Sequence, residues 1–101
     1  MKTLAENKYR SAFAHDILMV LRAVGFYAKL DRSGSKVRVR VHVGPRHADR
    51  FLLLIPARGE QYRVTQGDTR LDPLDARLGG DECPHDVARE FTARIATVLT
   101  F

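Results

Sequence analysis

The residues best placed to do chemistry lie in one run, Lys36–Val43, which reads Lys-Val-Arg-Val-Arg-Val-His-Val. Side chains of a β-strand point alternately to its two faces, so the valines share one face and the polar residues share the other. Arginine binds carboxylate and phosphate groups through paired hydrogen bonds. The run therefore predicts a half-buried strand with a positive stripe on its outer side. That stripe consists of Lys36, Arg38, Arg40 and His42.

We expect polar side chains of the neighbouring strands to share this surface. Cations beside an aromatic ring can hold single-stranded nucleic acid, through phosphate pairing and base stacking. A merely solvated face is the alternative, because antiparallel sheets commonly leave one side polar. The expected surface consists of Tyr27, Lys29, Arg38, Arg40, His42 and Arg63.

The run Phe51–Ile55 is apolar at every position. If its odd-numbered residues face the core, Leu52 and Leu54 lie beside the cations. Apolar side chains exposed in a central strand indicate a surface that something covers. The cover is a protein partner, a second copy of the chain, or the chain's own segment 67–83.

The polar connection before this run, residues 44–50, is a further candidate. Arg46, His47 and Arg50 could bind phosphate there, although such a connection is commonly only solvated. No glycine-rich phosphate cradle of the usual spacings is present in the sequence.

Catalytic and metal sites are not indicated. Cys83, His85 and Asp86 form a dense cluster with two more acidic residues, but no second ligand pair completes a zinc site. An acidic helix start explains the cluster better. We therefore expect no metal, no cofactor and no enzymatic activity.

Charge is distributed unevenly along the chain. The net charge is +5 and the pI about 9.9. Residues 1–66 carry an excess of basic residues, whereas residues 67–90 are acidic overall. Such asymmetry indicates a polyanionic partner or internal pairing. A GC-rich, bacterial genome would also enrich arginine, so composition alone does not decide between partners.

The chain's 101 residues suit a single domain. Its lone cysteine fits a reducing compartment, and it shows neither a leader-like apolar segment nor a run long enough to span a bilayer. We therefore expect a cytoplasmic protein without a membrane partner.

The pattern of apolar residues predicts the elements that position these side chains. Steps of three and four predict helices over 4–24 and from residue 84 onward. The sequence Asp72-Pro73 is typical of a helix start and predicts a short helix near 73–78. Strands are expected over 26–32, 36–43, 51–55 and 61–66. The expected fold is α+β: a four-stranded antiparallel meander with both long helices on one face, in the order α-β-β-β-β-α.

These features favour a small non-enzymatic interaction module, such as an adaptor or inhibitor. Its basic sheet face would bind a protein partner or its own second copy. The alternative is a nucleic-acid-binding domain that grips phosphates through Arg38, Arg40 and their neighbours. The candidate binding residues are Tyr27, Lys29, Arg38, Arg40, His42, Arg46, Arg50, Leu52, Leu54 and Arg63.

Overall fold

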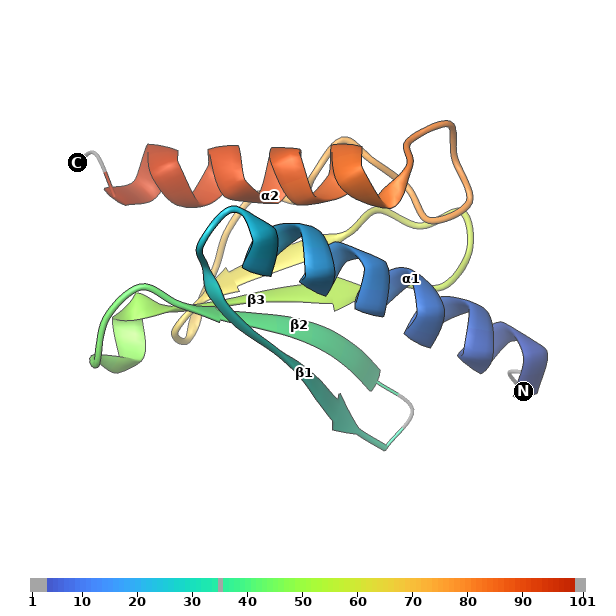
Figure 1. Cartoon of the computed structure of the whole chain (residues 1–101), viewed down its shortest axis with the longest axis horizontal. Coiled ribbons are helices and arrows are strands. Elements are labelled where there is room, and N and C mark those ends of the chain that lie inside the picture. The colour runs from blue at the N-terminus through green and yellow to red at the C-terminus, as the bar shows by residue number, and fades with distance from the viewer. Residues whose placement is uncertain (1–3, 35, 100–101) are drawn as a thin grey trace.

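The computed structural model describes residues 4–34 and 36–99, with side chains from Lys8 onward. The helices α1 and α2 lie together on one face of a single antiparallel sheet, as the sequence predicts (Figure 1). The strands follow one another across the sheet in chain order, from β1 to β5. The elements are α1 Leu4–Ala23, β1 Tyr27–Ser33, β2 Lys36–His42, a short 3-10 turn His47–Asp49, β3 Arg50–Ile55, β4 Arg63–Gln66, β5 Thr69–Arg70 and α2 Pro84–Leu99.

The core lies between the sheet and the helices. The valines of β2 are buried, and the register places Val39 opposite Leu53 and Val41 opposite Phe51. Leu53 lies in turn opposite Val64 of β4. The apolar sides of the three central strands therefore form one continuous floor, which stabilises the sheet by removing apolar surface from water. The helices cover this floor with Ala14, Ile17, Leu18, Leu21, Val87, Phe91 and Ile95.

Helix α1 ends within one residue of the predicted end, and a glycine in the left-handed region follows it. Gly25 has a φ of +101°, and its N–H donates to Arg22 O at 3.1 Å. The Phe26 N–H donates to Leu21 O at 3.0 Å, which completes a Schellman cap. This tight reversal starts β1 directly beneath the helix. Val24, which the predicted helix included, lies past the helix end and is 62% exposed.

The prediction of a short helix near 73–78 is wrong. Residues 71–78, here called the edge segment, run extended beside β4. The Leu74 N–H donates to Tyr62 O at 3.0 Å, and the Leu78 N–H donates to Glu60 O at 3.1 Å. Leu74, Ala76 and Leu78 are buried while Asp75 and Arg77 are exposed. This period of two is that of a strand, and pairing with the open edge of β4 stabilises it over a local helix.

The sheet has one more strand than the sequence predicts. Gln66 pairs with Thr69 and Thr65 with Arg70, so that Gly67 and Asp68 form a two-residue hairpin loop. Gly67 supplies the positive φ, +57°, that such a loop requires. The short strand β5 thereby brings Arg70 beside β4.

Candidate binding face

The side of the sheet turned away from the helices is uncovered along its strands (Figure 1). We call this side the open face. Strand alternation and register assign its residues directly, because the opposite side chains are those buried in the core. It consists of Tyr27, Lys29, Asp31, Ser33, Lys36, Arg38, Arg40, His42, Arg50, Leu52, Leu54, Arg63, Thr65 and Arg70.

Leu52 and Leu54 form an apolar strip along the middle of the open face. Arg40 lies opposite Leu52, and Arg38 lies opposite Leu54, on the β2 side. On the β4 side, Arg63 lies opposite Leu54. Both leucines are half-buried. The strip is therefore an apolar centre with arginine on both flanks, and it lies in a shallow hollow of about 180 Å³.

The cations of the open face lack carboxylate partners among the described residues. The ion pairs between described residues join Arg46 to Asp49 at 3.2 Å and His47 to Asp68 at 3.0 Å. Both pairs belong to the turns beside the sheet. The acidic residues of 67–90 therefore do not neutralise the open face, which leaves its positive charge available to a ligand.

Two guanidinium groups on this face also hold an unused donor. The Nε atoms of Arg40 and Arg50 are shielded from solvent and have no hydrogen-bond acceptor among the described residues. A shielded donor without an acceptor is unfavourable. An anionic ligand that reached these groups would therefore gain from satisfying them.

The end of the open face near β1 carries an aromatic ring among cations. Tyr27 is 60% exposed, and its ring meets that of His42 edge-on at 5.9 Å. The Lys29 ammonium lies 5.3 Å from the Tyr27 ring centre and lowers the pKa of the Tyr27 hydroxyl. Partial burial, together with Arg40 and other cations, lowers the pKa of His42. His42 therefore favours the neutral form on the free face.

The structure brings together nine of the ten residues that the sequence proposes for binding. The exception is Arg46, which directly precedes the 3-10 turn. Its side chain is 80% exposed, and its guanidinium and backbone N–H both donate to the Asp49 carboxylate. Sequence reasoning missed Arg70 as a member of the face. Lys36 was placed in the positive stripe but was not counted among the candidate binding residues. The dipeptide Gly67-Asp68 between polar residues is the signal that could have revealed β5 and hence Arg70.

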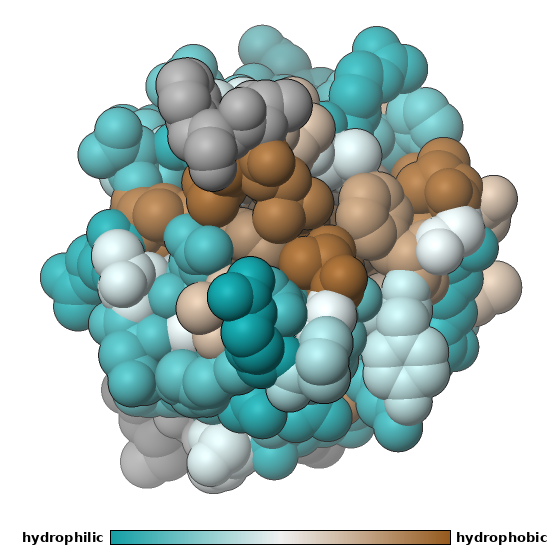
Figure 2. Space-filling view, turned by 90° about the vertical axis from the view of Figure 1, so that its left-hand side faces the viewer, coloured by the Kyte–Doolittle hydropathy of each residue, from teal (hydrophilic) through white to brown (hydrophobic). Residues whose placement is uncertain are grey.

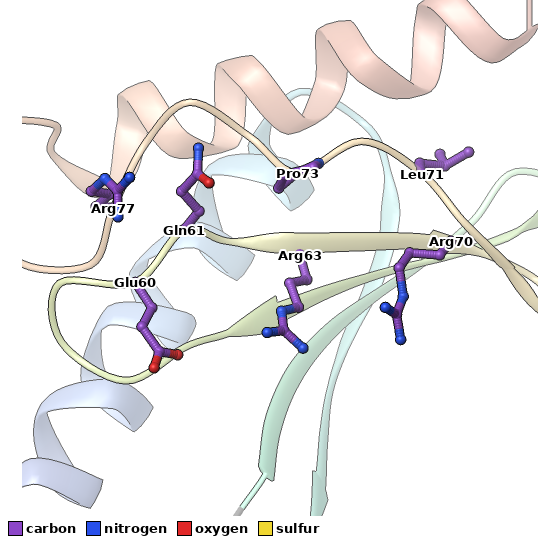
Figure 3. Close-up of a pocket in the computed structure, with 7 residues that line it drawn as sticks. All are labelled: Glu60, Gln61, Arg63, Arg70, Leu71, Pro73 and Arg77. Carbon is purple, nitrogen blue, oxygen red and sulfur yellow. The ribbon is translucent and has the colours of Figure 1, made fainter.

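A second hollow, of about 420 Å³, adjoins the open face where β4 meets the edge segment (Figure 3). Arg63 and Arg70 line it together with Gln61, which lies just before β4, and with three residues of the edge segment, Leu71, Pro73 and Arg77. Because Arg63 and Arg70 also line the hollow over the apolar strip, the two hollows share a wall.

The helix layer has an apolar patch of its own, at the end of the molecule where α1 and α2 terminate (Figure 2). Met19, Val24 and Leu99 are each more than half exposed. The groove beside them, about 280 Å³, is lined mainly by Val20, Val24, Phe26 and Ala88. This patch lies on the opposite layer from the open face.

The cluster around Cys83 is a helix start. The Asp86 carboxylate accepts hydrogen bonds from the Cys83 N–H at 3.3 Å and from its Sγ at 3.2 Å, and these bonds lower the pKa of Asp86. Across the part of the chain that the structure describes, no group of three or more histidine, cysteine or acidic side chains is arranged to hold a metal. Over the same residues, no helix combines the length and the apolar character that a membrane span requires.

Compared with known proteins, the chain matches no family model, no curated protein and no solved structure. Function has therefore to be inferred from the geometry of these surfaces.

Proposed function

We propose that this chain is a small, non-enzymatic interaction module whose open face binds an acidic protein partner. The observation that carries the proposal is the apolar strip of Leu52 and Leu54 with arginine on both flanks. Protein interfaces combine an apolar centre with arginine, and both act most strongly where water is excluded. Half-buried leucines would contribute little to a face that binds its ligand through charge alone.

The charge of the open face decides which kind of protein fits. Among the described strand residues of the open face, Asp31 is the single carboxylate, and Glu60 lies at the margin of the face, against cations on every strand from β1 to β5. Two copies meeting through this face would bring like charges together, which opposes association. An acidic surface on another protein is complementary and would be steered toward the face during encounter.

Nucleic-acid binding is the second candidate, and one observation favours it. The cations continue across neighbouring strands to the exposed ring of Tyr27, on which a base could stack. Against it stands the apolar strip, because Leu52 and Leu54 occupy the middle of the track that a phosphate backbone would follow. We therefore rank the acidic protein first.

A nuclease-treated pull-down separates the two candidates. Wild-type protein is compared with Arg38→Glu/Arg40→Glu and with Arg89→Glu, a charge reversal on the exposed surface of α2. We expect wild type and Arg89→Glu to retain an acidic protein that the double variant loses. The purified candidate must then bind the wild type directly, with an affinity that falls as salt rises. A partner that the double variant retains would contradict the proposal.

A labelled single-stranded oligonucleotide, titrated at two salt concentrations, tests the alternative. Phosphate binding predicts an affinity that falls steeply with salt and is lost in Arg38→Glu/Arg40→Glu. We expect no saturable binding at physiological salt. Two results together would favour the nucleic-acid function instead: tight, salt-sensitive binding of the oligonucleotide, and no protein captured in the nuclease-treated pull-down.

A further inference from the structure

We infer that the hollow between β4 and the edge segment is a subsite for a phosphate monoester carried by the partner, bound by Arg63 and Arg70. This inference rests on the proposed function, because it names one chemical group that the partner presents. The hollow continues the open face past β4, so a partner seated on the apolar strip reaches it without leaving the surface.

The two arginines line the same hollows. Arg70 lies opposite Thr65, which places it diagonally across from Arg63 on one face. Diagonal neighbours in an antiparallel pair are about 7–8 Å apart, within reach of long side chains. Figure 3 shows both guanidinium groups pointing the same way, away from α2. Neither makes a hydrogen bond or ion pair with another described residue, so both are free to bind a ligand.

The rest of the hollow is held in place by bonds within the chain. Gln61 Nε2 donates to Leu74 O at 3.1 Å, and Arg77 Nη1 donates to Gly59 O at 3.0 Å. These bonds fix the rim. Leu71 and Pro73 supply an apolar wall beside the arginines.

Charge matching distinguishes a monoester from other anions. A single guanidinium fork satisfies one carboxylate through two hydrogen bonds. Two free forks in one hollow offer two positive charges and more donors than a carboxylate or a phosphodiester, each with one charge, can neutralise. A phosphate monoester carries about −1.5 to −2 at neutral pH and three acceptor oxygens, so it matches both arginines together.

Glu60 sets which end of the hollow takes the anion. Its carboxylate lines the end away from Arg70 and makes no ion pair with another described residue. A negative charge at that end repels a second anion and leaves the site between the arginines as the favoured position. Replacing Glu60 with glutamine should therefore strengthen anion binding rather than weaken it.

The test uses the Nε–Hε signals of the arginines in the ¹⁵N-labelled full chain, at constant ionic strength. The probes are phenyl phosphate, dimethyl phosphate and benzoate, which represent a monoester, a diester and a carboxylate. We expect saturable shifts at Arg63 and Arg70, with phenyl phosphate bound about tenfold more tightly than either other probe. Arg63→Gln and Arg70→Gln should each weaken binding about tenfold, Glu60→Gln should strengthen it, and Arg89→Gln should leave it unchanged.

Equal affinity for the three probes, or unsaturable shifts at all exposed arginines, would overturn the inference. The pull-down tests binding to the open face independently of this hollow. If it succeeds while phenyl phosphate does not bind, the subsite is wrong and the proposed function stands. If phenyl phosphate binds as expected but no protein depends on Arg38 and Arg40, the proposed function is wrong while the anion subsite stands.

Discussion

At the scale of one residue, the pKa of His42 reflects the positive charge of the open face. Its partial burial and the neighbouring Arg40, Arg50 and Lys29 lower its pKa below the usual value of about 6.5. The unfolded chain therefore binds more protons than the folded chain in the pH range just below 6.5. Under proton linkage, the folded state must lose stability as the pH falls through that range.

The His42→Gln variant tests this linkage. Urea unfolding at pH 7.5 and 5.5 should show a smaller loss of unfolding free energy on acidification in the variant than in wild type. The difference between the two proteins in this loss, rather than either loss alone, separates the contribution of His42 from that of the other histidines. An NMR titration of the His42 ring should give a midpoint below 6.5. A midpoint above 6.5, or equal losses in both proteins, would contradict the electrostatic description of the face.

Tyr62 presents a different residue-scale problem, in the core. Its side chain is fully buried against Phe13, and its hydroxyl has no hydrogen-bond partner among the described residues. Burial raises the pKa of Tyr62 strongly, so the group stays a neutral phenol. Burying a hydroxyl without a partner is costly.

We expect Tyr62→Phe to stabilise the protein by about 1 kcal/mol, because it removes the unpartnered hydroxyl without creating a large cavity. Urea unfolding measures the change. The control Tyr27→Phe, at an exposed position, should shift stability by less than about 0.5 kcal/mol. A loss of stability in Tyr62→Phe larger than that in the control would show that the hydroxyl has a role the contacts do not reveal.

At the scale of elements, the edge segment completes the core that the open face rests on. Leu74 and Leu78 are buried in the core, and their backbone N–H groups donate to Tyr62 O and Glu60 O, just before β4. Pairing there also keeps β4 from being an exposed sheet edge. The segment is thus a structural part of the sheet, and it supplies the wall of the phosphate subsite from its outer side.

Leu74→Ala should cost about 2–5 kcal/mol of unfolding free energy, because the buried side chain leaves a cavity. Leu99→Ala is the matched control, since Leu99 is 53% exposed at the end of α2 and should cost less than about 1 kcal/mol. Chemical denaturation of the two variants side by side measures the difference. Similar losses would mean that the edge segment is not packed into the core.

Most of the sheet and helix layer could be predicted from the sequence, because β2 and β4 alternate between apolar and polar residues and each helix repeats at three and four. β3 could be predicted instead as a short apolar run that ends at Pro56. The edge segment could not. Asp72-Pro73 is a strong local signal for a helix start, whereas Leu74-Asp75-Ala76-Arg77-Leu78 alternates like a strand. Only the unpaired edge of β4, a tertiary feature, decides between these two signals. Arg70 was missed from the binding face for the same reason, because a two-residue strand is too short to show a period.

Arg10 shows a second limit of sequence reading. It lies on α1 among apolar residues yet is only 2% exposed, and its Nη2 donates to Ile55 O at 3.5 Å. An arginine is expected at the surface by its residue type, although Arg10 lies on the apolar side of the helix, three and four residues before Phe13 and Ala14. Its burial depends on the carbonyl at the end of β3, which comes close to α1 only in the folded chain.

At the scale of the whole molecule, positive charge is concentrated on the open face. Its cations have no acidic ion-pair partners among the described residues, whereas the acidic residues of 67–90 lie on the hairpin loop, the edge segment, the turn before α2 and α2 itself. The net charge of +5 therefore understates the positive charge that a ligand meets on the sheet side. This separation orients an acidic partner before contact, and the apolar strip then holds it.

Site-specific photo-cross-linking tests this central claim most directly. A photoreactive residue placed at Leu52, in the apolar strip, is compared with one at Ala93, an exposed position on α2. The proposed function predicts that position 52 cross-links to an acidic protein, that the product disappears in the Arg38→Glu/Arg40→Glu background, and that position 93 gives no such product. Cross-linking from position 93 alone, or from position 52 to nucleic acid instead of protein, would contradict it.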